Sequence, residues 1–142
     1  MSGISKSPGG ADGSGSRSSD LKPDAYSLKP LAHEDFCYFT TVGRITGRPH
    51  EIEIWFSLVP ERGTLYMLSD SARSDWVLNL RRAPRVSVRI AGQTFEGSAR
   101  VVEDAEEDEL ARRLLVEKYE RSPGSLSGWR RRALPVAVDL TP

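Results

Sequence analysis

The stretch "TTVGRITGRPH", Thr40 to His50, contains two Gly-Arg pairs set four residues apart. Arg44 and Arg48 flank a turn that contains glycine, and the hydroxyls of Thr41 and Thr46 lie close by in the sequence. Glycine lets backbone amides approach a ligand, and arginine offers planar, charge-assisted donors to phosphate or carboxylate. The stretch therefore predicts an anion-binding turn. A basic hairpin turn that only caps a sheet is the alternative, and the residues alone leave both open.

A second candidate for anion binding is "LSDSARSDW", residues 68–76. It combines the hydroxyls of Ser69 and Ser74 with Arg73 and with the expected start of a helix, whose first amides lack intrahelical partners. Two such sites on neighbouring strands would suit a ligand with a long anionic tail.

Sequence motifs for other kinds of catalysis or ligand binding are absent or weak. The chain has no Gly-x-Ser-x-Gly elbow, no Walker loop and no complete dinucleotide fingerprint. Glu51 and Glu53 could form an acid/base pair, but alternating glutamates are more typical of the wet face of a strand. Cys37 is the single cysteine and is expected in the core; with only His33 and His50 beside it, no metal site is expected.

The bulk properties favour one globular domain behind a polar tail. The 142 residues carry 20 basic and 20 acidic side chains, a balance that argues against general nucleic-acid binding. Residues 1–27 are rich in Ser, Gly, Pro, Asp and Lys and are expected to be disordered, so the folded domain is placed at 28–142. No apolar run reaches membrane-spanning length and no secretory signal is recognised, so a cytoplasmic protein is expected.

The periodicity predicts six strands and two helices. In residues 50–59, Ile52, Ile54, Phe56 and Leu58 alternate with polar residues and with Trp55, which indicates one strand. Ala91-Gly92 is a plausible two-residue hairpin loop. The short antiparallel strands predict a mainly β (α+β) domain, a small barrel covered by helices. Strands are expected at 36–42, 50–59, 64–69, 85–90, 93–102 and 136–140, and helices at 75–83 and 103–120.

Four segments together resemble a known family. They are the Thr40–His50 stretch with the alternating strand after it, "SDWVLNLRRAPRVSV", "GQTFEGSARVV" and "GWRRRALPVAVDL". Their order and spacing are similar to those of the deazaflavin-dependent nitroreductases, also called F420-dependent oxidoreductases. That family belongs to the flavin-reductase-like split β-barrels and is related to the pyridoxamine-phosphate oxidases. The resemblance runs from about residue 36 to the C-terminus.

The resemblance implies a six-stranded antiparallel split β-barrel that binds coenzyme F420, a deazaflavin with a phosphodiester and an oligoglutamate tail. It implies hydride transfer from the reduced deazaflavin to a quinone, a nitro compound or an activated alkene. Because the cofactor carries the redox step, no catalytic side chain is assigned.

The resemblance also implies roles for individual residues. The turn would hold the phosphate and tail, the strand after it would lie along the ring, and the second loop with its helix would meet the cofactor. The expected cofactor residues are Arg44, Thr46, Gly47, Arg48, Pro49, His50, Ile52, Ile54, Trp55, Ser69, Asp70, Arg73, Ser74, Trp76 and Asn79. Core packing is the alternative role of Trp76. The expected substrate residues are Trp55, Tyr119 and Trp129.

Some positions depart from the family pattern. Ile45 stands where a second basic residue is common, and Asp70 brings a negative charge to the second loop. The alternatives are an FMN- or haem-binding split barrel and a cofactor carrier without enzymatic activity. The expected partner is a small-molecule hydride acceptor; a quinone would bring the protein to a membrane surface, and a homodimer is a further expectation.

Overall fold

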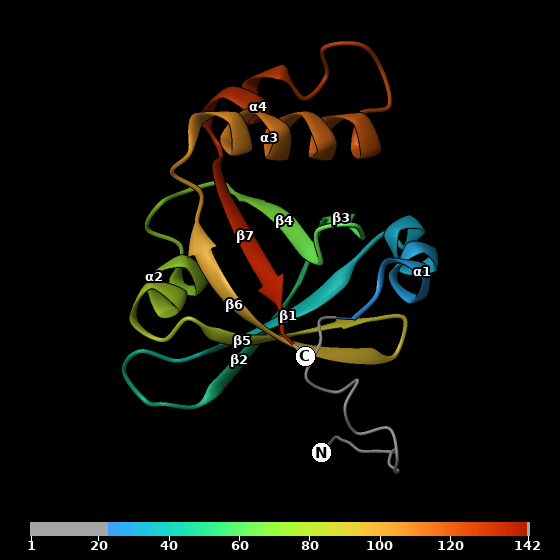
Figure 1. Cartoon of the computed structure of the whole chain (residues 1–142). Coiled ribbons are helices and arrows are strands. Elements are labelled where there is room, and N and C mark those ends of the chain that lie inside the picture. Colours follow the sequence, from blue (N-terminus) through green and yellow to red (C-terminus); the bar gives the residue numbers. More distant parts are fainter. Residues whose placement is uncertain (1–22, 142) are drawn as a thin grey trace.

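The computed structural model describes residues 23–141 and shows one curled, fully antiparallel sheet (Figure 1). Its seven strands follow the order β2-β1-β5-β6-β7-β4-β3. The expected antiparallel β class is confirmed, with seven strands in place of six. The strands are β1 (Cys37–Val42), β2 (Pro49–Ile54), β3 (Ser57–Val59), β4 (Thr64–Ser69), β5 (Arg85–Ile90), β6 (Gln93–Val101) and β7 (Leu134–Leu140).

The helices surround the sheet at its ends and side (Figure 1). The long helix α3 packs on β3, β4 and β7, and α4 lies beside α3, while α2 packs on β1 and β6. No helix between residues 23 and 141 has the length and apolar character needed to cross a membrane. The helices are α1 (Ala25–Leu28), the 3-10 helix η2 (Lys29–His33), α2 (Asp75–Arg82), α3 (Ala105–Tyr119) and α4 (Ser127–Arg132).

The extra strand arises because the predicted strand 50–59 breaks at Trp55–Phe56. The first part, β2, pairs with β1, whereas the second part, β3, pairs with β4 at the opposite edge of the sheet. A chain that changes partner strands cannot keep one continuous ladder. The predicted alternation is nevertheless correct, because Ile52, Ile54, Phe56 and Leu58 all pack into the same core.

Three further boundaries differ from expectation. The helix α1 begins at Ala25, three residues before the expected start of the domain at Leu28; residues 1–22 of the expected tail lie outside the described part. The basic segment 127–132 forms α4, which was not predicted, and β7 begins at Leu134 instead of Val136. The hairpin loop is confirmed: Ala91 and Gly92 have φ of 49° and 81°, the left-handed pair of a type I′ turn.

The strand β4 is buried on both faces and separates two hydrophobic clusters. Leu65 and Met67 face the main core inside the curled sheet, whereas Tyr66 and Leu68 face a second cluster. That second cluster also contains Leu115 and other apolar residues of α3. A strand covered on both sides explains why the residues between Thr64 and Ser69 are all apolar or aromatic.

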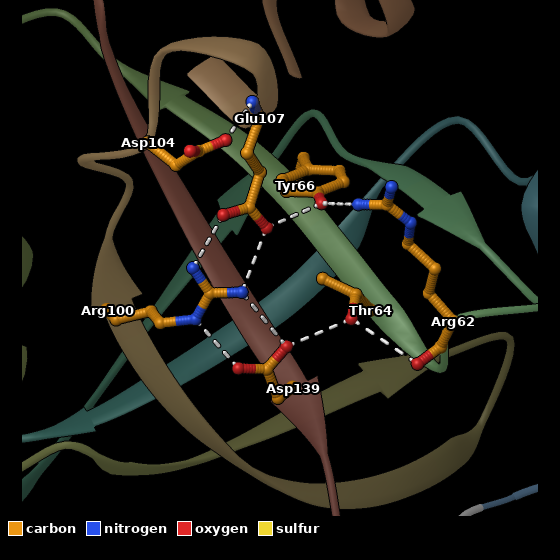
Figure 2. A network of polar contacts seen from close by, with 7 residues as sticks. All are labelled: Arg62, Thr64, Tyr66, Arg100, Asp104, Glu107 and Asp139. Carbon is orange, nitrogen blue, oxygen red and sulfur yellow. Dashed lines mark hydrogen bonds and ion pairs between the residues drawn. The ribbon is translucent and has the colours of Figure 1, made fainter. Parts of the chain in front are cut away.

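A network of charged groups joins α3 to the sheet (Figure 2). The guanidinium of Arg100 on β6 donates to both carboxylate oxygens of Glu107 on α3, at 2.8 and 2.9 Å, and its Nε donates to Asp139 on β7 at 2.8 Å. The hydroxyl of Tyr66 donates to Glu107 Oε2 at 2.7 Å. Asp104 caps the helix by accepting from the backbone N–H of Glu107 at 2.9 Å. Glu107 is therefore the point at which three elements are held together.

We expect Glu107→Gln to lower the free energy of unfolding at neutral pH by about 1–2 kcal/mol, because an amide cannot accept two charged hydrogen bonds from Arg100. The hydrogen bonds from Arg100 lower the pKa of Glu107. A lowered carboxyl pKa contributes stability above its unfolded value, near 4.3, and this contribution is lost as the pH falls through the folded value. The variant should therefore approach the wild type in acid.

Urea unfolding between about pH 3 and pH 7 measures this difference. Glu106→Gln is the matched control, since Glu106 is an exposed acid in the same helical turn. Equal losses in the two variants, or a Glu107→Gln loss that does not change with pH, would contradict the assigned role.

Candidate functional site

The turn between β1 and β2 is held closed by its own backbone. The N–H of Gly43 donates to the carbonyl of Arg48 at 2.7 Å, and the N–H of Gly47 donates to the carbonyl of Gly43 at 2.8 Å. Gly47 has φ of 76°, a conformation that side chains disfavour. A Cβ at Gly43 would lie 2.7 Å from the exposed His50 ring and 3.1 Å from the carbonyl oxygen of Arg48, so a side chain here would displace His50 and crowd the backbone. The backbone conformation thus requires glycine at position 47, and the packing of the turn favours glycine at position 43.

Asn79 on α2 connects this turn to the sheet. Its amide nitrogen donates to Thr41 Oγ1 at 3.1 Å, and its amide oxygen accepts from the backbone N–H and from Nη1 of Arg44, at 3.1 and 2.9 Å. The side chain is buried, so these three bonds satisfy a polar group that would otherwise be costly to bury. Figure 1 shows α2 next to the β1–β2 turn. Asn79 therefore orients Arg44.

Arg44 also forms an ion pair with Asp75, the first residue of α2, with 3.2 Å between Nη2 and Oδ1. The Asp75 side chain is 89% exposed, whereas that of Arg44 is 29% exposed. The guanidinium is thus fixed in place while its partner is open to water. Asp75 was not among the expected site residues.

A cavity of about 700 Å³ opens between the turn and the start of α2. The backbone N–H groups of Ile45 and Thr46 have no hydrogen-bond partner among the described residues, and both residues line this cavity. Free amides beside a fixed guanidinium are the donors that anions need. The lining consists of Gly43, Arg44, Ile45, Thr46, His50, Glu51, Ile52, Ser74, Asp75, Trp76 and Asn79.

A second cavity, of about 390 Å³, continues from the first along β2. Ile52, Ser74 and Trp76 line both, so the two cavities form one groove. The far part of this groove is mainly apolar and aromatic. It is lined by Phe36, Ile52, Glu53, Ile54, Trp55, Leu68, Ser69, Asp70, Ser74, Trp76 and Trp129.

The aromatic end of the groove is built around Trp55. Its ring is stacked parallel to Tyr119 with centroids 4.3 Å apart, and Trp129 meets it edge-on at 5.7 Å. The indole N–H of Trp129 donates to Asp70 Oδ1 at 3.1 Å, which ties α4 to the loop after β4. Asp70 therefore lies at the aromatic end, away from the Arg44 turn.

Tyr119 does not line the groove, which corrects its expected place on a substrate wall. It is 6% exposed, and its hydroxyl contacts the backbone N–H and carbonyl of Phe56 and donates to the carbonyl of Asp35. These bonds and the cover of Trp55 keep the ring behind the aromatic surface. Burial raises the pKa of Tyr119 to about 12, so the phenol stays neutral.

The loop that joins β4 to α2 is shaped by three serines. Ser69 Oγ donates to the carbonyl of Ser71 at 2.7 Å and shares a 2.9 Å hydrogen bond with Ser74 Oγ. Ser74 Oγ also donates to the carbonyl of Ser71. The network holds Ser74 where the two cavities meet.

Of the remaining expected residues, one packs against the core and the others lie on the surface outside both cavities. Trp76 meets Phe39 of the core edge-on at 5.6 Å and also lines both cavities. Arg48 and Arg73 are exposed and line neither cavity, and neither side chain has a hydrogen bond or ion pair within residues 23–141. Gly47 and Pro49 likewise line neither cavity.

Solved structures of similar fold include an F420-H2 dependent reductase, with 24% identity and a TM-score of 0.56 over 73% of this chain and 93% of that one. A conserved hypothetical protein from Mycobacterium tuberculosis, Rv2991, has 23% identity and a TM-score of 0.64 over 86% and 81%. HutZ, a haem storage protein from Vibrio cholerae, has 20% identity and a TM-score of 0.61 over 82% and 89%. At these identities the likeness shows the fold.

No curated protein matches the chain. A family model does: residues 24–141 match the model described as F420H(2)-dependent quinone reductase. The match covers almost the whole described part and includes every side chain that lines the groove. The chain therefore belongs to the F420H2-dependent quinone reductase family.

Proposed function

We propose that this protein binds coenzyme F420 in the groove and reduces a quinone with it. The observation that carries the proposal is the polarity of the groove. One end has a fixed guanidinium, Arg44, with two free backbone amides, and the other end is walled by Trp55 and Trp129. An elongated ligand with an anionic tail and a planar ring fits this arrangement. The free guanidiniums of Arg48 and Arg73, outside the cavities, would meet the part of the tail that leaves the groove.

When bound, reduced F420 supplies a hydride to the acceptor. The protein's part is to bind and orient. In this proposal Asn79 keeps Arg44 aimed at the phosphate, and Ile52 and Trp76 bracket the middle of the ligand where the cavities join. Trp55 offers a rigid aromatic surface on which a flat acceptor can stack, because Tyr119 supports its other face. Nitro compounds and activated alkenes are the other acceptor classes that the proposal includes.

Cofactor binding and turnover test the proposal separately. F420 and FMN are each titrated into the purified protein and followed by fluorescence polarisation. F420 is expected to bind and FMN to bind more weakly, because FMN has one phosphate and no glutamate tail. Tight FMN binding without F420 binding would overturn the choice of cofactor.

Reduced F420 is then mixed with menadione, and the visible absorbance of oxidised F420 should rise. Binding without turnover of several quinones would indicate a cofactor carrier.

We expect the double variant Arg44→Ala/Arg48→Ala to weaken F420 binding by about 2–4 kcal/mol, because two charge-assisted contacts to the anionic tail are lost. Arg82→Ala/Arg85→Ala is the matched control, since it removes the same charge from two exposed arginines that line neither cavity. Titration by fluorescence polarisation measures both. An affinity equal to that of the control variant would refute the role of the turn.

Asp75→Asn should have the opposite effect and tighten F420 binding several-fold. The Asp75 carboxylate accepts a hydrogen bond from Nη2 of Arg44, and an anionic ligand must compete with it for this donor. Glu103→Gln removes an equal charge from an exposed position outside the groove and is expected to change the affinity little. Weaker binding by Asp75→Asn would mean that the ion pair holds Arg44 in its binding position.

A further inference from the structure

The aromatic end of the groove combines indole rings with negative charge. All three tryptophans of the chain, Trp55, Trp76 and Trp129, line the second cavity. The charged side chains in its lining are two exposed carboxylates, Glu53 on β2 and Asp70 on the loop after β4. No Lys, Arg or His side chain of residues 23–141 lines this cavity. A ligand at this end therefore meets rings and carboxylates but no cationic side chain.

Both carboxylates are held by neutral hydrogen-bond donors. Glu53 Oε1 accepts from the Tyr38 hydroxyl at 3.0 Å, and Asp70 Oδ1 accepts from the indole N–H of Trp129 at 3.1 Å. The hydrogen bond to Glu53 raises the pKa of Tyr38, so the phenol keeps its proton and stays a neutral donor. Neither carboxylate forms an ion pair with any residue between 23 and 141. The donors thus position the two negative charges without neutralising them.

Bases on adjoining segments are bound elsewhere or lie outside the cavity. Arg89 on β5 pairs with Glu51 at 3.2 Å, and Arg130 on α4 pairs with Glu109 on α3. Arg73, on the loop after β4, is exposed and lines neither cavity. The negative charge at the aromatic end is therefore left for a ligand to compensate.

We propose that the aromatic end of the groove selects planar ligands by charge, taking organic cations over neutral rings and neutral rings over anions. The face of an indole ring attracts a cation, and carboxylates without a basic partner add to this attraction. The rings of Trp55 and Trp129 lie at 90° to each other, so they form adjoining walls of the cavity. Its volume of about 390 Å³ is sufficient for a small fused-ring molecule.

The inference rests on the proposed function for the statement that this ligand is the hydride acceptor, and it adds the charge of that acceptor. Charge discrimination between partners arises from attraction to the right ligand and from repulsion of the wrong one. Glu53 and Asp70 supply both effects, because they attract a cationic ring and repel a ring that carries a carboxylate or sulfonate. They act as specificity-determining residues and need not contact the reacting atoms.

Charge selection is measurable without the cofactor. The full chain is titrated at about pH 7.5 with N-methylquinolinium, a planar cation, and with quinoline, its neutral counterpart. Tryptophan fluorescence reports the binding, because every tryptophan of the chain lines this cavity. We expect saturable quenching with about tenfold tighter binding of the cation, and a smaller preference at high salt. Equal affinities, or tighter binding of quinoline, would overturn the proposal.

A double variant, Glu53→Gln/Asp70→Asn, tests which groups cause the preference. The amide oxygens can still accept from Tyr38 and Trp129, so the hydrogen bonds that shape the wall are kept. We expect the preference for the cation to fall to about twofold or less while quinoline binds as before. Glu96→Gln is the matched control, because Glu96 is an exposed acid on β6 that lines neither cavity. A double variant that keeps the wild-type preference would refute the assignment.

Turnover tests the same selection in the enzyme loaded with reduced F420. The acceptors are 1,4-naphthoquinone and its 2-sulfonate; each gains one hydride from the reduced cofactor and one proton by way of water. We expect the ratio of kcat/KM for the neutral quinone to that for the sulfonate to fall about tenfold in the double variant. An unchanged ratio would overturn the exclusion of anions. Failure of the proposed function would look different: neither quinone would be reduced, while the cofactor-free protein would still prefer the cation.

Discussion

The hydroxyl of Tyr119 is the contact on which the shape of this protein most depends. It bridges the backbone of Phe56 and the carbonyl of Asp35, and so holds α3 to the place where the chain leaves one edge of the sheet for the other. At this corner, Trp55–Phe56, the strand β2 has ended and β3 is about to begin. It also leaves Trp55 directed at the groove with the Tyr119 ring as its support. The corner between β2 and β3 and the aromatic wall of the groove are thus held by the same side chain.

The opposite end of the groove depends on a second buried polar group. Asn79, on α2, satisfies its hydrogen bonds with Thr41 and Arg44. Both of these partners belong to the β1–β2 hairpin. A buried amide with unmet bonds would be costly, so helix and turn keep a fixed relation. Both ends of the groove are therefore positioned by helices that pack on the sheet. The basic turn is thereby held in place both by its own backbone and by α2.

Much of the fold could be predicted from the sequence because its elements are locally consistent. The strands at 64–69 and 85–90, the Ala91-Gly92 hairpin and the two main helices follow from periodicity, caps and turn residues. The break at Trp55–Phe56 could not, because the alternation continues through it and only the pairing partner changes. The helix α4 was missed because none of its residues is buried and it carries no apolar stripe.

The sequence by itself determined which chemical groups the site can offer: the Gly-Arg repeat, the hydroxyl-rich loop and the aromatic residues near both. Only the tertiary structure decided how they are used. It placed Tyr119 behind Trp55, drew Asp70 to Trp129, and gave Arg44 the exposed partner Asp75. These outcomes rest on contacts between residues far apart in the chain. Local propensities do not encode such contacts, because they form only when the sheet curls and the helices pack.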